Sequence, residues 1–185
     1  MRVIAGQWKG TKLQAGHFVD LRPVTDRIKE SVYGTLRERI LYANVLDLFA
    51  GSGSMGIEAL SRGASYVVFV ERSEPIGRIM QKNLAKINCA ISDYDIMLSD
   101  VYKVLPDLQA RRLKFDLIFS DPPFQRPGAT QLLKAISDYE LLEKEGILVL
   151  RHHKNETVVE QVDQLALVRS KTYGDSVLKY YVIET

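Results

Sequence analysis

The sequence predicts an α/β protein with a mostly parallel sheet and helices on both faces. From Asn44 onward, short apolar runs rich in β-branched residues alternate with amphipathic segments, which is the pattern of a doubly wound fold. A glycine-rich loop separates the first apolar run from the amphipathic segment that follows it, as in many cofactor-binding sheets. The last two β-prone runs follow each other without a helix between them, so the sheet should end in an antiparallel hairpin.

The alternation fixes the expected order of elements. Strands are expected at 45–49, 66–70, 94–98, 115–120 and 146–151, and helices near 54–62, 75–87, 101–111, 128–138 and 155–163. The closing hairpin consists of "ALVRSKTYG" and "SVLKYYVIE", joined through "GDS", a composition typical of a tight turn.

The first 43 residues follow a different pattern. "RVIAGQWKGTKL" breaks short β-prone pieces with glycine, and apolar residues at 28, 32, 36 and 40 share one helix face. Thr25 is a suitable N-cap for this helix, with Asp26 in its first turn. We therefore expect a small β element plus one helix as an N-terminal extension (1–43), and a main domain over 44–185.

Composition narrows the possible classes of protein. The 46% apolar and 26% charged residues are those of an ordinary globular chain, and no apolar run approaches the length of a membrane span. A single cysteine and three scattered histidines suggest neither a disulfide nor a metal site. We expect a cytoplasmic monomer that binds neither metal nor membrane.

Positive charge is concentrated at the front of the chain. Residues 1–43 hold eight Lys or Arg against four Asp or Glu, although the net charge of the whole protein is only +2. Basic residues interleaved with an aromatic ring are typical of RNA-binding surfaces, and a solvated charged face with Trp8 covering the sheet is the alternative. The candidate RNA contacts are Arg2, Trp8, Lys9, Lys12, Arg22 and Arg37.

The glycine loop "DLFAGSGSMG" places Gly51, Gly53 and Gly56 in GxGxxG spacing. Glycine lets the backbone turn sharply and approach a ligand closely. Glu71, at the end of the second expected strand, is suited to accept hydrogen bonds from ribose hydroxyls. These features alone fit a nicotinamide dinucleotide as well as any other adenosine-containing cofactor.

Two further acids favour a cofactor with positive charge. Asp47 lies where a pyrophosphate would have to bind and would repel it, whereas it would attract the ammonium and sulfonium groups of S-adenosylmethionine. Asp100, after the third expected strand, could accept the exocyclic amine of adenine, or serve only as a helix N-cap.

The stretch "DLIFSDPPFQ" ends a strand with an acid, two prolines and an aromatic ring. An exocyclic amine on a nucleobase is a poor nucleophile, and a carboxylate and a backbone carbonyl that accept its two N–H groups would aim its lone pair. Asp121 and the carbonyl of Pro122 fit these roles. The prolines stiffen the loop, and Phe124 could stack on the base.

These motifs together identify the chain as similar to a known family. "DPPF" resembles the motif of class I, Rossmann-like methyltransferases that act on exocyclic amines. "RVIAGQWKGTKL", "LRPVTDRIKESVYGTL", "VLDLFAGSGSMGIEALSRGA", "FVER" and "YGDSVLKYY" extend the resemblance, over nearly the whole chain, to the bacterial 16S ribosomal RNA guanine-N2 methyltransferases.

The resemblance implies a function and a set of site residues. It implies S-adenosylmethionine as cofactor, S-adenosylhomocysteine as product, and a guanine of 16S rRNA, within the assembled small subunit, as substrate. It assigns the cofactor to Asp47, Phe49, Gly51, Gly53, Glu71, Asp100 and Val101, with Thr25 or Arg27 in a lid near its carboxylate. It assigns catalysis to Asp121, Pro122, Pro123 and Phe124.

Other functions share the amine geometry. Adenine-N6 methylation of DNA or RNA, and methylation of a glutamine amide in a protein, would need the same four-residue motif. A non-catalytic RNA-binding scaffold is the alternative from another class.

Overall fold

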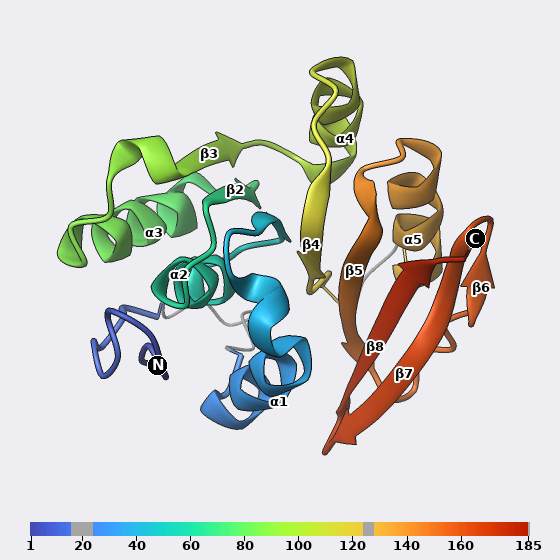
Figure 1. Ribbon diagram of the computed structural model, residues 1–185, viewed down its shortest axis with the longest axis horizontal. Coiled ribbons are helices and arrows are strands. Elements are labelled where there is room, and N and C mark those ends of the chain that lie inside the picture. The colour runs from blue at the N-terminus through green and yellow to red at the C-terminus, as the bar shows by residue number, and fades with distance from the viewer. Residues whose placement is uncertain (16–23, 124–127, 185) are drawn as a thin grey trace.

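The computed structural model describes residues 1–15, 24–123 and 128–184, which form one eight-stranded sheet of order β3-β2-β1-β4-β5-β8-β7-β6 (Figure 1). The parallel half comprises β1 (Asn44–Leu48), β2 (Tyr66–Glu71), β3 (Tyr94–Leu98), β4 (Phe115–Ser120) and β5 (Leu142–His153). The antiparallel half comprises β6 (Gln161–Val162), β7 (Leu165–Tyr173) and β8 (Ser176–Ile183). The predicted fold class, including the closing hairpin, is confirmed.

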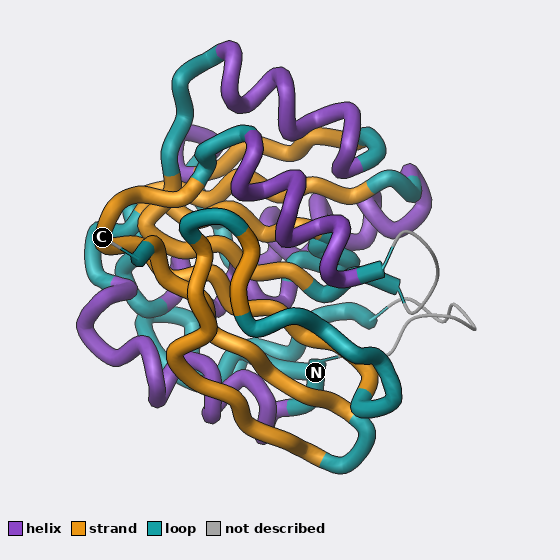
Figure 2. The backbone as a smooth tube through the Cα atoms, turned by 90° about the vertical axis from the view of Figure 1, so that its right-hand side faces the viewer, coloured by secondary structure: helices purple, strands orange, loops and turns teal. Residues whose placement is uncertain are grey.

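Helices cover both faces of the sheet (Figure 2). The helices α1 (Asp26–Leu36, extended by the 3₁₀ turn Arg37–Ile40), α2 (Ser54–Ser61) and α3 (Glu74–Lys86) share one apolar cluster with the sheet. The helices α4 (Val101–Ala110) and α5 (Ala129–Asp138) share a second cluster with the other face. In the described part of the chain, no helix is both long and apolar enough to cross a bilayer.

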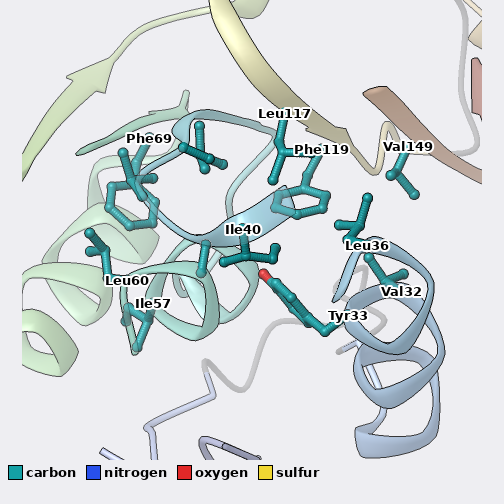
Figure 3. Close-up of a cluster of buried hydrophobic side chains, with 14 of the residues drawn as sticks. Val32, Tyr33, Leu36, Ile40, Ile57, Leu60, Phe69, Leu117, Phe119 and Val149 are labelled. Carbon is teal, nitrogen blue, oxygen red and sulfur yellow. The ribbon is translucent and has the colours of Figure 1, made fainter. Parts of the chain in front are cut away.

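Helix α1 belongs to the first cluster although it comes from the N-terminal segment. Tyr33 packs on Phe119 of β4 with ring centroids 5.7 Å apart, and its hydroxyl donates to the carbonyl of Met55 (Figure 3). The expected N-cap is present, since the Ile28 amide donates to Oγ1 of Thr25 at 3.3 Å. The helix therefore forms one wall of the sheet's core.

A buried carboxylate fastens the first residues of the chain, which contain one isolated bridge between Arg2 and Lys12, to α2. Glu58 is fully buried and accepts hydrogen bonds from the amides of Ile4 (2.8 Å) and Ala5 (3.0 Å). It also pairs with Lys29 of α1 (3.2 Å) and with Arg62 (2.9 Å). One acid thus joins three segments of the chain, and its four donors compensate the cost of burying the charge. The expected boundary at residue 43 stays a prediction.

The helix expected at 155–163 is wrong. This segment instead makes turns and then the short strand β6, which pairs with the outer edge of β7 through Gln161↔Ala166 and Val162↔Leu165. The run "TVVEQV" is rich in β-branched residues, which favour strands. The pairing of β6 with β7 satisfies backbone N–H and C=O groups on the outer edge of β7. A helix in this segment would leave those groups of β7 without a partner strand.

We expect Glu58→Gln to lower the free energy of unfolding by about 3 kcal/mol, because it leaves Lys29 buried without its counter-ion. Chemical denaturation measures the change. The matched control is Glu74→Gln, which removes an exposed pair with Arg78 and should cost no more than about 0.5 kcal/mol. Equal, small effects of both substitutions would contradict this role for Glu58.

Candidate active site

The register of the parallel strands brings the predicted acids to one edge of the sheet. Leu48 pairs with both Val70 and Ser120, so Glu71 and Asp121, each one residue further on, lie at the same level. Side chains alternate along a strand. Asp47, Glu71 and Asp121 have the same parity as Val45, Phe69 and Phe119, which face the α1–α3 side. The three acids therefore line one side of the carboxyl edge.

The glycine loop is held against β2 by Glu71. The Gly51 amide donates to Oε2 of Glu71 at 3.0 Å, and the Ser73 amide donates to Oε1 at 2.8 Å. Gly51 and Gly53 have φ of 57° and 80°, and Phe49 also has a positive φ of 58°. A bulky residue in this conformation is strained, which is common at ligand sites. The loop therefore has a fixed shape in which little side-chain bulk covers the sheet edge.

Asp47 is the most deeply buried acid of the edge, with 3% exposure. Its Oδ2 accepts a hydrogen bond from the Gly56 amide at 2.8 Å. Gly56 must lack a side chain, because a Cβ would lie 2.2 Å from Cε1 of Phe69. Burial raises the pKa of Asp47 to about 7, with the charges of Asp121 and Glu71 adding to the rise and the Gly56 amide opposing it.

Asp121 is paired with an arginine that the sequence analysis did not select. Nη1 of Arg151 donates to Oδ2 of Asp121 at 2.7 Å, and Nε of Arg151 donates to Oγ of Ser176 on β8 at 3.1 Å. Burial raises the pKa of Asp121, and Arg151 opposes this rise. The pairing of β4 with β5 would have predicted this contact. Ser120 pairs with Leu150, so Asp121 and Arg151, which follow them in the chain, lie side by side.

The remaining predicted catalytic and cofactor residues have diverse positions. Pro122 is buried and Pro123 is exposed, while Phe124 lies outside the described residues.

Among the predicted cofactor residues, Asp100 caps α4 by accepting a hydrogen bond from the Tyr102 amide at 2.9 Å, and Val101 packs in the α4–α5 cluster. Thr25 acts as the N-cap of α1, and the guanidinium of Arg27 lies 5.6 Å from the ring centre of Tyr173. Their cofactor roles stay predictions.

The predicted RNA-binding residues do not share one environment. Arg2 pairs with Asp26 at 3.0 Å, and Trp8 is partly buried against the first apolar cluster. Lys9, Lys12 and Arg37 are exposed, and Arg22 lies outside the described residues. Among these residues, the exposed lysines keep the chemistry needed for phosphate contacts.

A model of the family described as "Conserved hypothetical protein 95" matches residues 1–182. The chain belongs to this family. It is 36% identical over 174 residues to YlbH of Bacillus subtilis, covering 94% of each chain. It is 32% identical over 174 residues to "Ribosomal RNA small subunit methyltransferase D" of Haemophilus influenzae, covering 94% of this chain and 89% of that protein. The family resemblance seen in the sequence is confirmed.

A solved structure has the same fold as this member of the Conserved hypothetical protein 95 family. The yhhF protein of Escherichia coli is 28% identical and superposes with a TM-score of 0.86, covering 100% of this chain and 98% of that chain. The agreement extends to the antiparallel half of the sheet, because the match covers both chains almost completely.

The edge of the sheet carries polar groups that a polar cofactor could satisfy. Oγ of Ser54, next to the glycine loop, and Oγ of Ser120, next to Asp121, are buried without a hydrogen-bond partner among the described residues. Unsatisfied buried hydroxyls are costly and point to a missing partner. Within the described ranges, no three His, Cys, Asp or Glu side chains are grouped as metal ligands. The acids and the hydroxyl of Ser54 suit the amine and hydroxyl groups of a nucleoside that carries an amino acid, whereas Ser120 has the parity of Ile118 and faces the α4–α5 side.

We expect Asp47→Asn to stabilise the free protein at pH 8. A folded-state pKa of about 7, above the unfolded value, means that ionising Asp47 costs stability as pH rises from about 4 to 7. The uncharged, isosteric amide removes this cost, and a gain of about 2 kcal/mol corresponds to roughly 4–8 °C in Tm for a chain of this size. Thermal unfolding at pH 5 and pH 8 checks it, and a variant less stable than the parent at pH 8 would contradict it.

Proposed function

We propose that this protein transfers a methyl group from S-adenosylmethionine to the exocyclic N2 amine of a guanine in 16S rRNA. The observation that carries the proposal is the position of Asp121, which lies beside Asp47 and level with Glu71 at the carboxyl edge of the sheet. A base bound at Asp121 would therefore meet a ligand bound at the other two acids. The rRNA methyltransferase name of a 32% identical relative supports the proposed class of substrate.

The cofactor end of the proposed site uses Asp47, Glu71 and the glycine loop. Glu71 keeps further acceptor capacity on both oxygens for ribose hydroxyls, because each oxygen receives one backbone N–H. Asp47 provides negative charge for the ammonium group of the methionine part. When bound, S-adenosylmethionine supplies a methyl carbon on a positively charged sulfur and leaves as neutral S-adenosylhomocysteine.

The amine end uses Asp121 and the carbonyl of Pro122. Asp121 accepts one N–H of the amine and Pro122 accepts the other, which directs the nitrogen lone pair toward the carbon that it attacks. The methylated nitrogen then loses its excess proton, for which Asp121 is the nearest base. Orientation of this kind can lower a barrier by about 7 to 11 kcal/mol, so no strong base is required.

The substrate is a structured RNA held at the basic N-terminal surface. Lys9 and Lys12 are exposed and would contact phosphates, and the target guanine would have to leave its stack to reach Asp121. We infer that the assembled small subunit is preferred over naked RNA, and that the protein acts as a cytoplasmic monomer.

The methylated nucleoside tests the proposal. Small subunits from cells lacking the gene are incubated with the protein and methyl-labelled cofactor, and their 16S rRNA is digested for mass spectrometry. Labelled N2-methylguanosine is expected. Labelled N6-methyladenosine would contradict the proposal and indicate adenine-N6 methylation instead. Label on a ribosomal protein would contradict it and indicate methylation of a glutamine amide.

Binding of S-adenosylmethionine should weaken as the pH falls. Because Asp47 has a pKa of about 7 in the free protein, its ionised fraction falls about tenfold between pH 8 and pH 6, and the attraction for the ammonium group falls with it. We expect about a tenfold rise in Kd over this range by calorimetry. Asp47→Asn should bind weakly at both values, and an equally steep pH dependence in that variant would exclude Asp47 as its source.

Asp121→Asn should reduce methyl transfer at least about 100-fold, because it removes a charge-assisted acceptor from the reacting amine. Binding of S-adenosylhomocysteine should change little. The matched control is Asp116→Asn at the opposite end of the same strand, where the carboxylate only accepts from the Asn44 amide. Near-normal turnover by Asp121→Asn would refute the proposed role of Asp121.

A further inference from the structure

We propose that Arg151 is the positioning residue that holds Asp121 ionised and in one orientation for the methylation reaction. This inference rests on the proposed function and extends it to a residue outside the Asp-Pro-Pro motif. Its basis is the chain of contacts from Ser176 on β8 through Arg151 on β5 to Asp121 after β4.

Strand pairing and burial fix the geometry of the contact between Arg151 and Asp121. In the antiparallel pair of β5 and β8, Arg151 lies opposite Leu178. Ser176 is two residues before Leu178 on β8, so its side chain projects from the same face of the sheet as that of Arg151. The side chain of Arg151 keeps 7% exposure and that of Asp121 keeps 29%. The rigid guanidinium donates in two directions, from Nε to Ser176 and from Nη1 to Asp121, so the position of one oxygen of Asp121 is set by the hairpin.

The hairpin that carries Ser176 is itself fixed to α1. The hydroxyl of Tyr173, at the end of β7, shares a hydrogen bond with Oγ of Ser31, and Lys171 donates to Oγ1 of Thr35 at 3.0 Å. Strands β7 and β8 pair along their whole length up to Tyr173↔Ser176. Ser176, which orients Arg151, therefore belongs to a strand that is fixed by pairing with β7 and by the contacts of β7 with α1.

One oxygen of Asp121 stays available for the amine. Arg151 uses Oδ2, and Oδ1 accepts no hydrogen bond from the described residues. A carboxylate with one oxygen fixed presents the other in a defined direction, which is what alignment of a planar amine requires. Arg151 also lowers the proton affinity of Asp121, which suits an orienting acceptor better than a strong base.

The electrostatic surroundings explain why a cation is needed here. The charge of Asp121 acts on the carboxylate of Asp47 on β1, and Glu71 at the end of β2 adds a third charge of the same sign to this edge. Tyr33 of α1 packs on the neighbouring Phe119 and carries no charge, since burial raises its pKa well above the ordinary value. His152, the next residue of β5, has the opposite parity. Burial raises the pKa of Asp121 and so favours its protonation, and Arg151 provides the opposing positive charge.

Single-turnover methylation of small subunits by the full chain, measured from pH 5.5 to 9 with S-adenosylmethionine saturating at every pH, tests the inference. Saturation removes the pH dependence that Asp47 gives to cofactor binding. Arg151→Met should slow methyl transfer at pH 7 by about tenfold or more, and should shift the acidic limb of the rate profile to higher pH, because Asp121 then protonates more easily. Calorimetric binding of S-adenosylhomocysteine should change by less than about twofold. The matched control, Arg111→Met, removes an exposed arginine paired with Asp107 on α4 and should leave rate and profile unchanged.

Two further variants keep the test decisive if Arg151→Met folds poorly. Arg151→Lys keeps the positive charge but loses the planar guanidinium that donates to both Ser176 and Asp121. It should therefore lower the rate of methyl transfer while leaving the acidic limb of the pH profile in place. Ser176→Ala removes only the second anchor and should cause a smaller loss of rate. A uniform loss in Arg151→Met without a shift of the acidic limb, or no loss at all, would overturn the inference.

The proposed function and this inference fail in different ways. If the parent protein methylates the subunit and Arg151→Met behaves like it, only the inference is wrong. If the parent protein transfers no methyl group to 16S rRNA, the proposed function is wrong. In that case, ¹³C NMR titration of the Asp121 carboxyl still tests the electrostatic effect, since its pKa must rise in Arg151→Met and an unchanged value would refute it.

Discussion

The site depends on holding three carboxylates close together at one edge of a sheet. Asp47, Glu71 and Asp121 project from neighbouring strands on the same face, where the charges of Glu71 and Asp121 repel that of Asp47, and burial disfavours ionisation of Asp47 and Asp121. Each is held by a different donor, namely the amide of Gly56, the amides of Gly51 and Ser73, and the guanidinium of Arg151. These donors make the negative edge compatible with a folded chain.

The compensation is unequal, and this inequality gives the acids different properties. Glu71 receives two backbone amides, and Asp121 faces a full positive charge. Asp47 receives one amide in the most buried position, so its pKa rises to about 7. A group that is costly to ionise in the free protein is stabilised when a cation binds beside it. Stability of the free protein is thereby exchanged for affinity, as is common at functional sites.

The N-terminal segment and the hairpin complete the site from two sides. Glu58 of α2, the helix that follows the glycine loop, fastens the first residues and α1 to this helix. The hairpin reaches the site through Ser176 and Arg151, and it contacts α1 through Tyr173. Segments far apart in the sequence therefore meet around the carboxyl edge, although only its central strands carry the predicted motifs.

The sequence predicted the central features of this arrangement and missed those that depend on long-range pairing. Strand ends at Glu71 and Asp121, the glycine loop and the cap at Thr25 follow from local patterns, and the structure has all of them. Residues 161 and 162 of the segment 155–163 form the edge strand β6 because the open side of β7 offers them hydrogen-bond partners, which no local pattern shows. Arg151 is the last residue of the strand expected at 146–151, and only the register of β4 against β5 brings it beside Asp121.

The central claim is that a nucleobase amine binds at Asp121, directly opposite a cofactor held by Asp47 and Glu71. A cryo-electron microscopy structure of the protein on an unmodified small subunit, with S-adenosylhomocysteine bound, tests it most directly. We expect an unstacked guanine whose N2 lies within hydrogen-bonding distance of Asp121 and faces the sulfur. A cofactor bound away from the glycine loop, or a target base that does not reach Asp121, would contradict it.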